Sequence, residues 1–262
     1  MSSRVRVIIP TGFGINCEAE TAHAFKLAGA DPLEIHLNDL IARPEALASA
    51  GILVLAGGFS FGDHLGAGKV FANRLRRRLG QSVGAFVERG GLVLGICNGF
   101  QTLARLGLVP DGSLGSQAVA LAPNSHGCFH DGWVTLAVDP ASPCLFTKGL
   151  ERLEVPVRHG EGRLLTSPEV LEVIRAQHLA PVRYADPGTD QPTGVFPANP
   201  NGSLDSIAGL CDCSGRIFGL MPHPEAFLYP ECHPLWRWRQ ERPQGEGLVI
   251  FQNAVQEAVG CK

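Results

Sequence analysis

Wholly apolar runs, without alternation of polar residues, recur along the first half of the chain. Ile52–Ala56 and Leu92–Ile96 are two of them, and each leads through a turn into a helical pattern. Strands without alternation are typical of a parallel sheet that is buried on both faces. The repetition therefore predicts an α/β, flavodoxin-like, doubly wound, mostly parallel sheet. The predicted strands are Val5–Ile9, Leu33–Leu37, Ile52–Ala56 and Leu92–Ile96, and the predicted helices are Cys17–Leu27, Gly66–Arg89 and Asn98–Leu106.

The second half of the chain is richer in strand patterns and predicts added antiparallel strands. No linker is long enough to separate domains, so residues 1–262 are expected to form a single domain. The segment 229–247 is rich in proline and charge and predicts a surface insertion. The predicted strands are Gln117–Leu121, Trp133–Val138, Val155–Arg158, Val170–Arg175, Ser206–Cys211 and Ile217–Leu220, and Leu248–Val259 is a predicted closing helix.

Charge and composition narrow the possible partners and the compartment. A formal net charge of −3 does not favour nucleic acid. No apolar run approaches the ~20 residues that span a bilayer, so no membrane association is expected. The basic start of the chain fits a first strand better than a signal peptide. Eight scattered cysteines without a secretion signal indicate reduced thiols, and a cytoplasmic location is expected.

One group of cysteines raises the alternative of a zinc site. Cys211 and Cys213 are separated by one residue, and Cys232 precedes His233. Structural zinc ligands usually have two to four residues between the first pair, and this spacing is absent. The same residues are also explained as small buried side chains or surface thiols. We therefore expect no metal site.

The strongest chemical signal is LVLGICNGFQ, Leu92 to Gln101. An apolar strand leads through Gly95 and Gly99, which bracket Cys97, into a helix. This is the strand–turn–helix pattern of a nucleophile elbow with cysteine in place of serine. The helix N-terminus favours the thiolate. The alternative is a buried cysteine in a tight turn, and the two flanking glycines favour the nucleophile.

A cysteine nucleophile needs a base, and the base needs a group that orients it. His223 follows the apolar run Ile217–Leu220, so it too is expected near a strand end. Glu225 lies two residues further on, on the same side of an extended segment. His-Pro-Glu is a weak signal alone. Together with the elbow it predicts a triad of Cys97, His223 and Glu225.

The stretch GGFSFGDHLGAGKV, Gly57 to Val70, resembles a phosphate-binding loop at first sight. The P-loop pattern needs glycine at the position of Asp63 and serine or threonine at the position of Val70, and neither is present. We therefore predict a strand-end loop without an ATP site. Its Gly58 N–H and the N–H of Asn98 are the expected donors to an oxyanion.

At these residues the chain resembles the class I (triad) glutamine amidotransferases, and most closely the glutaminase subunits of phosphoribosylformylglycinamidine synthase. The likeness covers most of the chain. It is specific, because GGFSFGD and GICNGFQ occur together and "HGEGR", "NPNGS" and "GLMPHPE" follow in order. The chain departs from the family at Cys128 and Gly132, where arginines are usual. The resemblance implies Cys97 as nucleophile, His223 as acid and base, Glu225 as its orienter, Gly58 and Asn98 as oxyanion donors and Gln101 as a substrate-binding residue.

The resemblance also implies a reaction and partners. Glutamine would be hydrolysed to glutamate, and ammonia would pass to a large ATP-dependent synthetase subunit (PurL-like). That subunit would convert formylglycinamide ribonucleotide to formylglycinamidine ribonucleotide in purine biosynthesis, with a small accessory subunit (PurS-like) as a further possible partner. No cofactor is expected on this chain, and ATP and magnesium are expected on the partner.

Two other classes of function remain open from the sequence. One is a different cysteine hydrolase on the same fold, of the DJ-1-like or peptidase-like kind. Those enzymes have a histidine next to the cysteine, where this chain has Asn98. The other is a non-catalytic binding module with an inactive elbow. The presence of all three triad residues disfavours it.

Overall fold

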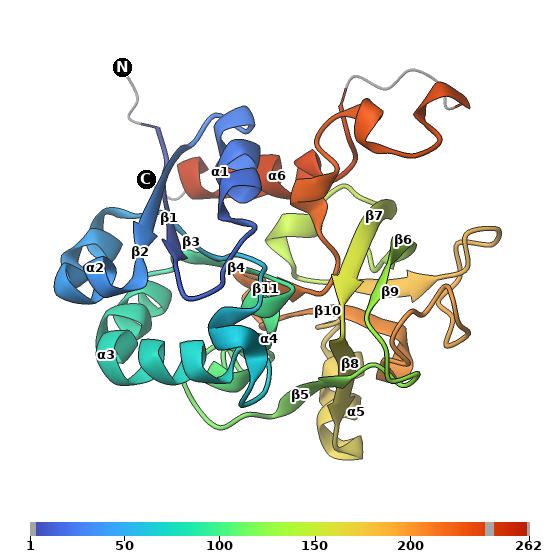
Figure 1. The fold of residues 1–262 in the computed structure, drawn as a ribbon, viewed down its shortest axis with the longest axis horizontal. Coiled ribbons are helices and arrows are strands. Elements are labelled where there is room, and N and C mark those ends of the chain that lie inside the picture. Colours follow the sequence, from blue (N-terminus) through green and yellow to red (C-terminus); the bar gives the residue numbers. More distant parts are fainter. Residues whose placement is uncertain (1–3, 239–243, 261–262) are drawn as a thin grey trace.

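The fold is taken from a computed structural model that describes residues 4–238 and 244–260. Figure 1 shows one large sheet with helices packed on its two faces. The strands of the large sheet are β1 (Arg6–Thr11), β2 (Asp31–His36), β3 (Ile52–Leu55), β4 (Leu92–Ile96), β6 (His130–Val138), β7 (Arg152–His159), β9 (Val182–Ala185), β10 (Ile207–Cys211) and β11 (Ile217–Leu220). The remaining elements are the strands β5 (Val119–Pro123) and β8 (Glu161–Thr166), which pair with each other, and the helices α1 (Glu18–Leu27), α2 (Leu37–Ala42), α3 (Lys69–Glu88), α4 (Asn98–Leu106), α5 (Pro168–Ala176) and α6 (Leu248–Gly260).

The large sheet has the strand order β2-β1-β3-β4-β11-β10-β9-β6-β7. The pairings from β2 to β11 are parallel, and those from β11 to β7 are antiparallel. In the parallel half every residue of β3 and β4 is buried. Helices α1 and α6 cover one face and α3 and α4 the other (Figure 1), and Phe25 of α1 packs edge-on against Phe251 of α6. The predicted fold class is confirmed.

One predicted strand is wrong. Val170–Arg175 lies within helix α5. The Ser167 hydroxyl accepts the Val170 N–H as an N-cap, and Pro168 occupies the first turn, where its fixed backbone angle suits a helix. The buried positions Leu171 and Ile174 are three residues apart, which is a helical spacing. A β-branched composition favoured a strand, but the cap and this spacing determine the helix.

Two strands and a short helix were not predicted. Helix α2 (Leu37–Ala42) begins where the strand Leu33–Leu37 was expected to end. Strand β8 begins inside the HGEGR segment, at Glu161, and contains its second glycine, and β9 is only four residues long. A four-residue strand is too short for its side-chain pattern to stand out along the chain.

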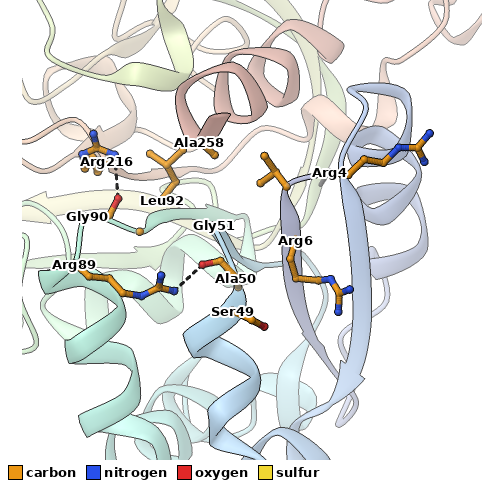
Figure 2. A pocket seen from close by; sticks show the side chains of 12 residues that line it. Arg4, Arg6, Ser49, Ala50, Gly51, Arg89, Gly90, Leu92, Arg216 and Ala258 are labelled. Carbon is orange, nitrogen blue, oxygen red and sulfur yellow. Dashed lines mark hydrogen bonds between the residues drawn. The ribbon is translucent and has the colours of Figure 1, made fainter. Parts of the chain in front are cut away.

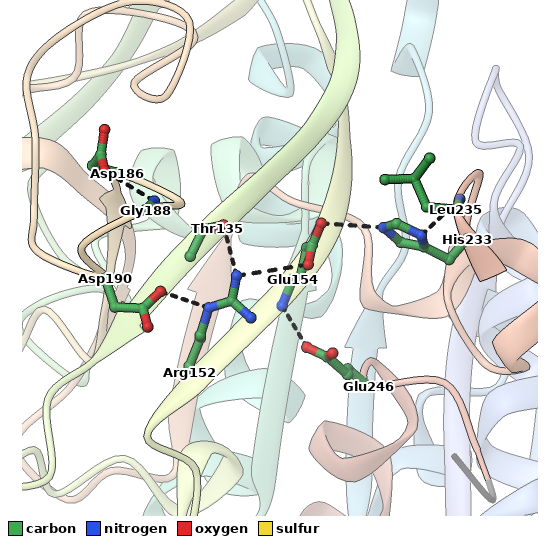
Figure 3. A network of polar contacts seen from close by, with 9 residues as sticks. All are labelled: Thr135, Arg152, Glu154, Asp186, Gly188, Asp190, His233, Leu235 and Glu246. Carbon is green, nitrogen blue, oxygen red and sulfur yellow. Dashed lines mark hydrogen bonds and ion pairs between the residues drawn. The ribbon is translucent and has the colours of Figure 1, made fainter. Parts of the chain in front are cut away.

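The predicted insertion, residues 229–247, is described except for 239–243. Its His233 is buried against β6 and β7, although Trp238 is 81% exposed. The Leu235 N–H donates to Nδ1 of His233, so Nε2 carries the proton and donates to Glu154 at 3.1 Å. Glu154 belongs to a network with Arg152 and Asp190 (Figure 3). The insertion is therefore anchored to the antiparallel edge of the sheet.

The zinc set considered from the sequence does not form. Cys211 is buried in β10, Cys213 and Cys232 are exposed, and His233 is bonded to Glu154. These residues belong to no group of metal-ligating atoms found among the described residues. Within the described ranges, no helix combines the length and apolar character needed to cross a membrane.

Candidate active site

The predicted site residues meet at the carboxyl ends of the parallel strands, where open α/β sheets form their sites. Cys97 directly follows β4, and His223 lies shortly after β11. These two strands are neighbours in register, with Ile96 opposite Leu220. The Cys97 N–H donates to the Leu220 carbonyl at 2.8 Å. The sheet itself therefore brings the thiol and the imidazole together, although they are far apart along the chain.

Cys97 has the backbone of a nucleophile elbow. Its φ of 51° and ψ of −104° lie outside the regions that ordinary residues adopt, and it immediately precedes α4. Gly95 and Gly99, which bracket Cys97, allow neighbouring backbone segments to approach closely. A Cβ at Gly99 would lie 1.8 Å from the carbonyl oxygen of Leu55, and one at Gly95 would lie 2.8 Å from Gly99. The predicted turn is present, and Cys97 as a residue is 5% exposed.

His223 and Glu225 form a buried ion pair. Nδ1 of the imidazole donates to Oε1 of Glu225 at 2.6 Å, and both side chains are at most 3% exposed. Burial opposes a charge on the ring, but the Glu225 carboxylate and the neighbouring thiol of Cys97 outweigh it and raise the pKa of His223. Nε2 has no hydrogen-bond partner among the described residues. This nitrogen is thus available for proton transfer.

Two backbone N–H groups at the site are free to donate. Gly58 has φ +150°, and a Cβ there would lie 2.6 Å from the Gly14 carbonyl. Hydrogen bonds on either side pin this turn, from Phe59 N–H to Gly14 and from Asn16 N–H to Gly57. No group among the described residues accepts the Gly58 N–H. The Asn98 N–H is the first of helix α4 and has no intrahelical partner.

The side chains of Asn98 and Gln101 tie the Gly57–Asp63 loop to the elbow. Nδ2 of Asn98 donates to Oδ1 of Asp63 at 3.1 Å and to Oε1 of Gln101 at 2.8 Å. The Gln101 amide in turn donates to the Glu161 carbonyl at 2.5 Å. Burial raises the pKa of Asp63. Gln101 is thus held by protein groups here, and its binding of substrate remains a prediction.

Cys17 is a site residue that the sequence analysis missed. It lies between the end of β1 and the start of α1. Like Cys97 and His223, it therefore lies at the carboxyl edge of the parallel strands. A Cβ placed on Gly57 would lie 3.2 Å from the Cys17 sulfur and 2.9 Å from Cε1 of His223. The thiol and the imidazole therefore flank Gly57 together. Burial raises the pKa of Cys17, so this thiol is protonated near neutral pH.

A second buried histidine, His159, lies close enough for its charge to be coupled to that of His223. Its Nδ1 donates to Oδ1 of Asn124 at 3.1 Å, and its Nε2 faces Nδ2 of Asn201 at 3.5 Å. Asn201 also donates to the hydroxyl of Tyr184. Burial without a charged partner lowers the pKa of His159 to about 3. This ring is therefore neutral.

The cavity in Figure 2 lies at the opposite edge of the sheet and is a different feature. It has a volume of about 370 Å³ and lies at the amino ends of β1, β3 and β4. Arg89 donates to the carbonyls of Leu47 and Ala50, and Arg216 donates to the carbonyl of Gly90. These arginines satisfy carbonyl groups where helical segments end, which is a structural role.

Comparisons with known proteins agree with this geometry. The CobB/CobQ-like glutamine amidotransferase domain matches residues 4–256. The phosphoribosylformylglycinamidine synthase subunit PurQ of Dehalococcoides mccartyi is 46% identical over 256 residues, covering 98% of each chain. PurQ of Methanococcus maripaludis is 40% identical over 96% of each chain. A chain from the structure of PurLQS of Thermotoga maritima superposes with a TM-score of 0.71 at 30% identity, covering 97% of this chain and 99% of that one. The chain belongs to the CobB/CobQ-like glutamine amidotransferases, in the branch of the PurQ subunits of phosphoribosylformylglycinamidine synthase.

Proposed function

We propose that this chain is the glutaminase subunit of a phosphoribosylformylglycinamidine synthase. It hydrolyses glutamine to glutamate and passes ammonia to a synthetase subunit, which converts formylglycinamide ribonucleotide to formylglycinamidine ribonucleotide. The observation that carries the proposal is the strained Cys97 at the end of β4 beside the buried pair of His223 and Glu225. The alignment with PurQ relatives over nearly the whole chain supports the choice of reaction.

In the proposed mechanism Cys97 attacks the side-chain amide carbon of glutamine. The raised pKa of His223 favours a charged imidazolium at the site, and the attacking form of the cysteine is its thiolate. The N–H groups of Gly58 and Asn98 stabilise the tetrahedral oxyanion. His223 protonates the leaving ammonia through Nε2, and the thioester remains on Cys97.

The second half of the reaction uses the same groups in the opposite direction. Neutral His223 takes a proton from water, which attacks the thioester carbon and releases glutamate. Glu225 keeps the imidazole in one orientation and stabilises its charge, as the carboxylate of a serine protease triad does. Asp63, Asn98 and Gln101 hold the loop and the elbow in register so that the two N–H donors keep their positions.

The fate of ammonia implies a partner. Free ammonia is mostly protonated near neutral pH and is then not nucleophilic, so it must pass directly to an acceptor. We propose a large PurL-like synthetase subunit as that partner and a small PurS-like subunit beside it. The relative in the PurLQS structure supports this assembly. ATP and magnesium are assigned to the partner, and this chain is proposed to need no cofactor. The cytoplasm, where thiols remain reduced, is the proposed location.

Of the other classes of function, neither is favoured by a specific observation. The histidine beside Cys97 in space is His223, which is distant in sequence, unlike the arrangement of DJ-1-like hydrolases. A binding module would not require Cys97 at strained backbone angles or the buried charge of Glu225. Both features cost stability and are explained by catalysis.

The test is covalent labelling of the complex with a glutamine-like electrophile, diazo-oxo-norleucine. We expect one adduct, on Cys97 by mass spectrometry, with loss of glutamine-dependent but not ammonia-dependent synthesis. Cys97→Ala should be unlabelled and inactive with glutamine, whereas Cys213→Ala, which changes an exposed thiol, should behave as the parent. Labelling at another residue, or glutamine-dependent activity in Cys97→Ala, would overturn the assignment.

A further inference from the structure

Two backbone carbonyls of β7 contact the residues that react. β7 is the last strand of the large sheet, beside β6. Its Pro156 carbonyl accepts the His223 N–H at 2.8 Å. Two residues further on, the Arg158 carbonyl lies 3.7 Å from Sγ of Cys97 and accepts the thiol proton. A shift of β7 would therefore disturb the positions of the base and the nucleophile together.

The insertion, residues 229–247, fixes β7 just before these contacts begin. Nε2 of His233 donates to Oε1 of Glu154 at 3.1 Å (Figure 3). Near the other end of the insertion, a carboxylate oxygen of Glu246 accepts the Glu154 N–H at 2.8 Å. Both parts of the insertion thus bind one residue of β7, and Pro156 follows two positions later.

The ring of His233 also packs against the segment that follows the triad carboxylate. Its centroid lies 4.4 Å from that of Trp133 in β6 and 5.7 Å from that of Phe227. Phe227 is buried two residues after Glu225, and its N–H closes the turn by donating to the Pro224 carbonyl at 3.1 Å. The imidazole is therefore held between the sheet and the turn that carries Glu225, which fixes the direction of its bond to β7.

We propose that His233 is a positioning residue for the proposed glutaminase reaction. Its bond to Glu154 connects the turn of Glu225 with the strand whose carbonyls contact His223 and Cys97. The inference rests on the proposed function, because it concerns the rate of that reaction. Loss of the bond should misplace the triad, and a displacement of roughly 1 Å can lower a rate about a hundredfold.

Two substitutions separate the bond to β7 from the packing of the ring. The amide nitrogen of a glutamine side chain lies close to the position of a histidine Nε2, so His233→Gln can still donate to Glu154. An asparagine side chain ends near the position of Nδ1. His233→Asn therefore keeps an acceptor for the Leu235 N–H and loses the bond to Glu154. Both variants lack the ring, so the difference between them reports the bond.

Steady-state kinetics of glutamine hydrolysis in the complex is the first measurement. In His233→Asn kcat should fall about tenfold or more, with KM within about threefold of the parent, because the triad is misplaced and the substrate pocket is not altered. His233→Gln should lose clearly less, about threefold or less. His178→Asn breaks an exposed pair with Asp139 at 2.8 Å and should match the parent. Equal kcat values in His233→Asn and His233→Gln would overturn the proposal.

Hydrogen exchange is the second measurement, and it needs no glutamine. Mass spectrometry of the peptide of residues 221–227 follows the His223 N–H that Pro156 accepts. Exchange should be faster in His233→Asn than in His233→Gln or the parent, because β7 holds this amide less firmly. A parent complex that does not use glutamine would refute the proposed function. Unchanged exchange in folded His233→Asn would instead overturn the role of His233.

Discussion

Two buried histidines of this protein have opposite electrostatic states. His223 and His159 are each 2% exposed, and burial alone would make both rings neutral. The pKa of His223 is nevertheless raised, because Nδ1 bonds to the Glu225 carboxylate. The pKa of His159 falls to about 3, because burial disfavours the charged ring and no carboxylate offsets it: Nδ1 donates to the neutral amide of Asn124. A carboxylate partner therefore allows the buried His223 ring to carry a charge, whereas an amide partner leaves the buried His159 ring neutral.

The comparison extends to the second ring nitrogen. Nε2 of His223 has no hydrogen-bond partner in the described chain, whereas Nε2 of His159 faces the Asn201 amide at 3.5 Å. Asn201 is itself bonded to Tyr184 and to the Gly162 carbonyl. His159 is therefore one member of a satisfied polar network, which rigidifies the wall of the site. His223 keeps one nitrogen available, as a proton-transfer group must.

Removing the carboxylate should have the largest effect. In Glu225→Gln, burial dominates, the pKa of His223 falls, and the ring loses its charged form. We expect glutamine hydrolysis in the complex to fall about a thousandfold or more, as for triads that lose their acid. Alkylation of Cys97 should also slow at neutral pH. Glu231→Gln, on the exposed surface nearby, is the control. Wild-type rates in Glu225→Gln would show that Glu225 does not set the state of His223.

The second largest effect is expected from loss of an oxyanion donor, the Gly58 N–H. Gly58→Ala requires a side chain at φ +150°, with its Cβ 2.6 Å from the Gly14 carbonyl. The N–H should be displaced, and kcat should fall on the order of a hundredfold, the usual effect of losing one oxyanion donor. Gly84→Ala in α3 is the control, because nothing lies within 4 Å of its new Cβ.

A comparison of kcat with thermal stability separates the two consequences of Gly58→Ala. Strain should lower the melting temperature, whereas Gly84→Ala should stabilise the helix by about 0.5–1 kcal/mol. If folded Gly58→Ala turned over glutamine at the parent rate, Gly58 would not be an oxyanion donor.

His159 should affect stability rather than catalysis. Its pKa is about 3 in the folded protein and about 6.5 unfolded, so below pH 6.5 the unfolded chain binds the extra proton. The contribution to stability is complete above pH 6.5 and is lost as the pH falls towards 3. By pH 5 the loss amounts to about 2 kcal/mol. Urea unfolding at pH 7 and pH 5 should show this difference in the parent.

In His159→Gln this part of the pH dependence should vanish, while the glutaminase rate at pH 7 changes less than threefold. An unchanged pH dependence would mean that other groups cause the acid sensitivity. A large loss of kcat without loss of stability would instead assign His159 to catalysis.

Much of the parallel half could be predicted from the sequence. Leu92–Ile96 and Ile217–Leu220 are fully buried strands, and the predicted limits match the observed ones. Their neighbours in the sheet could not be deduced, because register depends on long-range pairing. Val170–Arg175 failed for a different reason: its residues suit a strand, and the cap at Ser167 determines the helix.

The candidate site, too, could be predicted in part from the sequence. Cys97, His223 and Glu225 were predicted to lie together from the glycines around Cys97, the two strand ends and the two-residue spacing of His223 and Glu225, and the structure brings them together. Cys17 was missed, although it also follows a strand, because no glycine bracket marks it. The network of Asp63, Asn98 and Gln101 depends on side-chain directions, which local sequence does not specify.

The substitution with the smallest expected effect on glutamine turnover is the sharpest test of the comparison. It gives His159 a carboxylate partner, as His223 has. In Asn124→Asp a carboxylate replaces the amide whose Oδ1 lies 3.1 Å from Nδ1 of His159. An opposite charge at this distance typically shifts a pKa by one to three units. We expect an NMR titration to place the His159 pKa at least one unit higher, with glutamine turnover at pH 7 almost unchanged.

Asn124→Asp also removes the Nδ2 donor to the carbonyls of Cys128 and His159, at 2.9 and 2.8 Å. This loss should destabilise the fold by about 1–3 kcal/mol. The carbonyl oxygens of Cys128 and His159 then lack this donor. A protonated carboxyl group at position 124 could donate to one of them, and it would then carry no charge to stabilise an imidazolium at His159. In that case the His159 pKa would stay near 3, and burial rather than the partner's charge would be the controlling factor at this position. A raised pKa would instead establish that the partner alone distinguishes the two histidines.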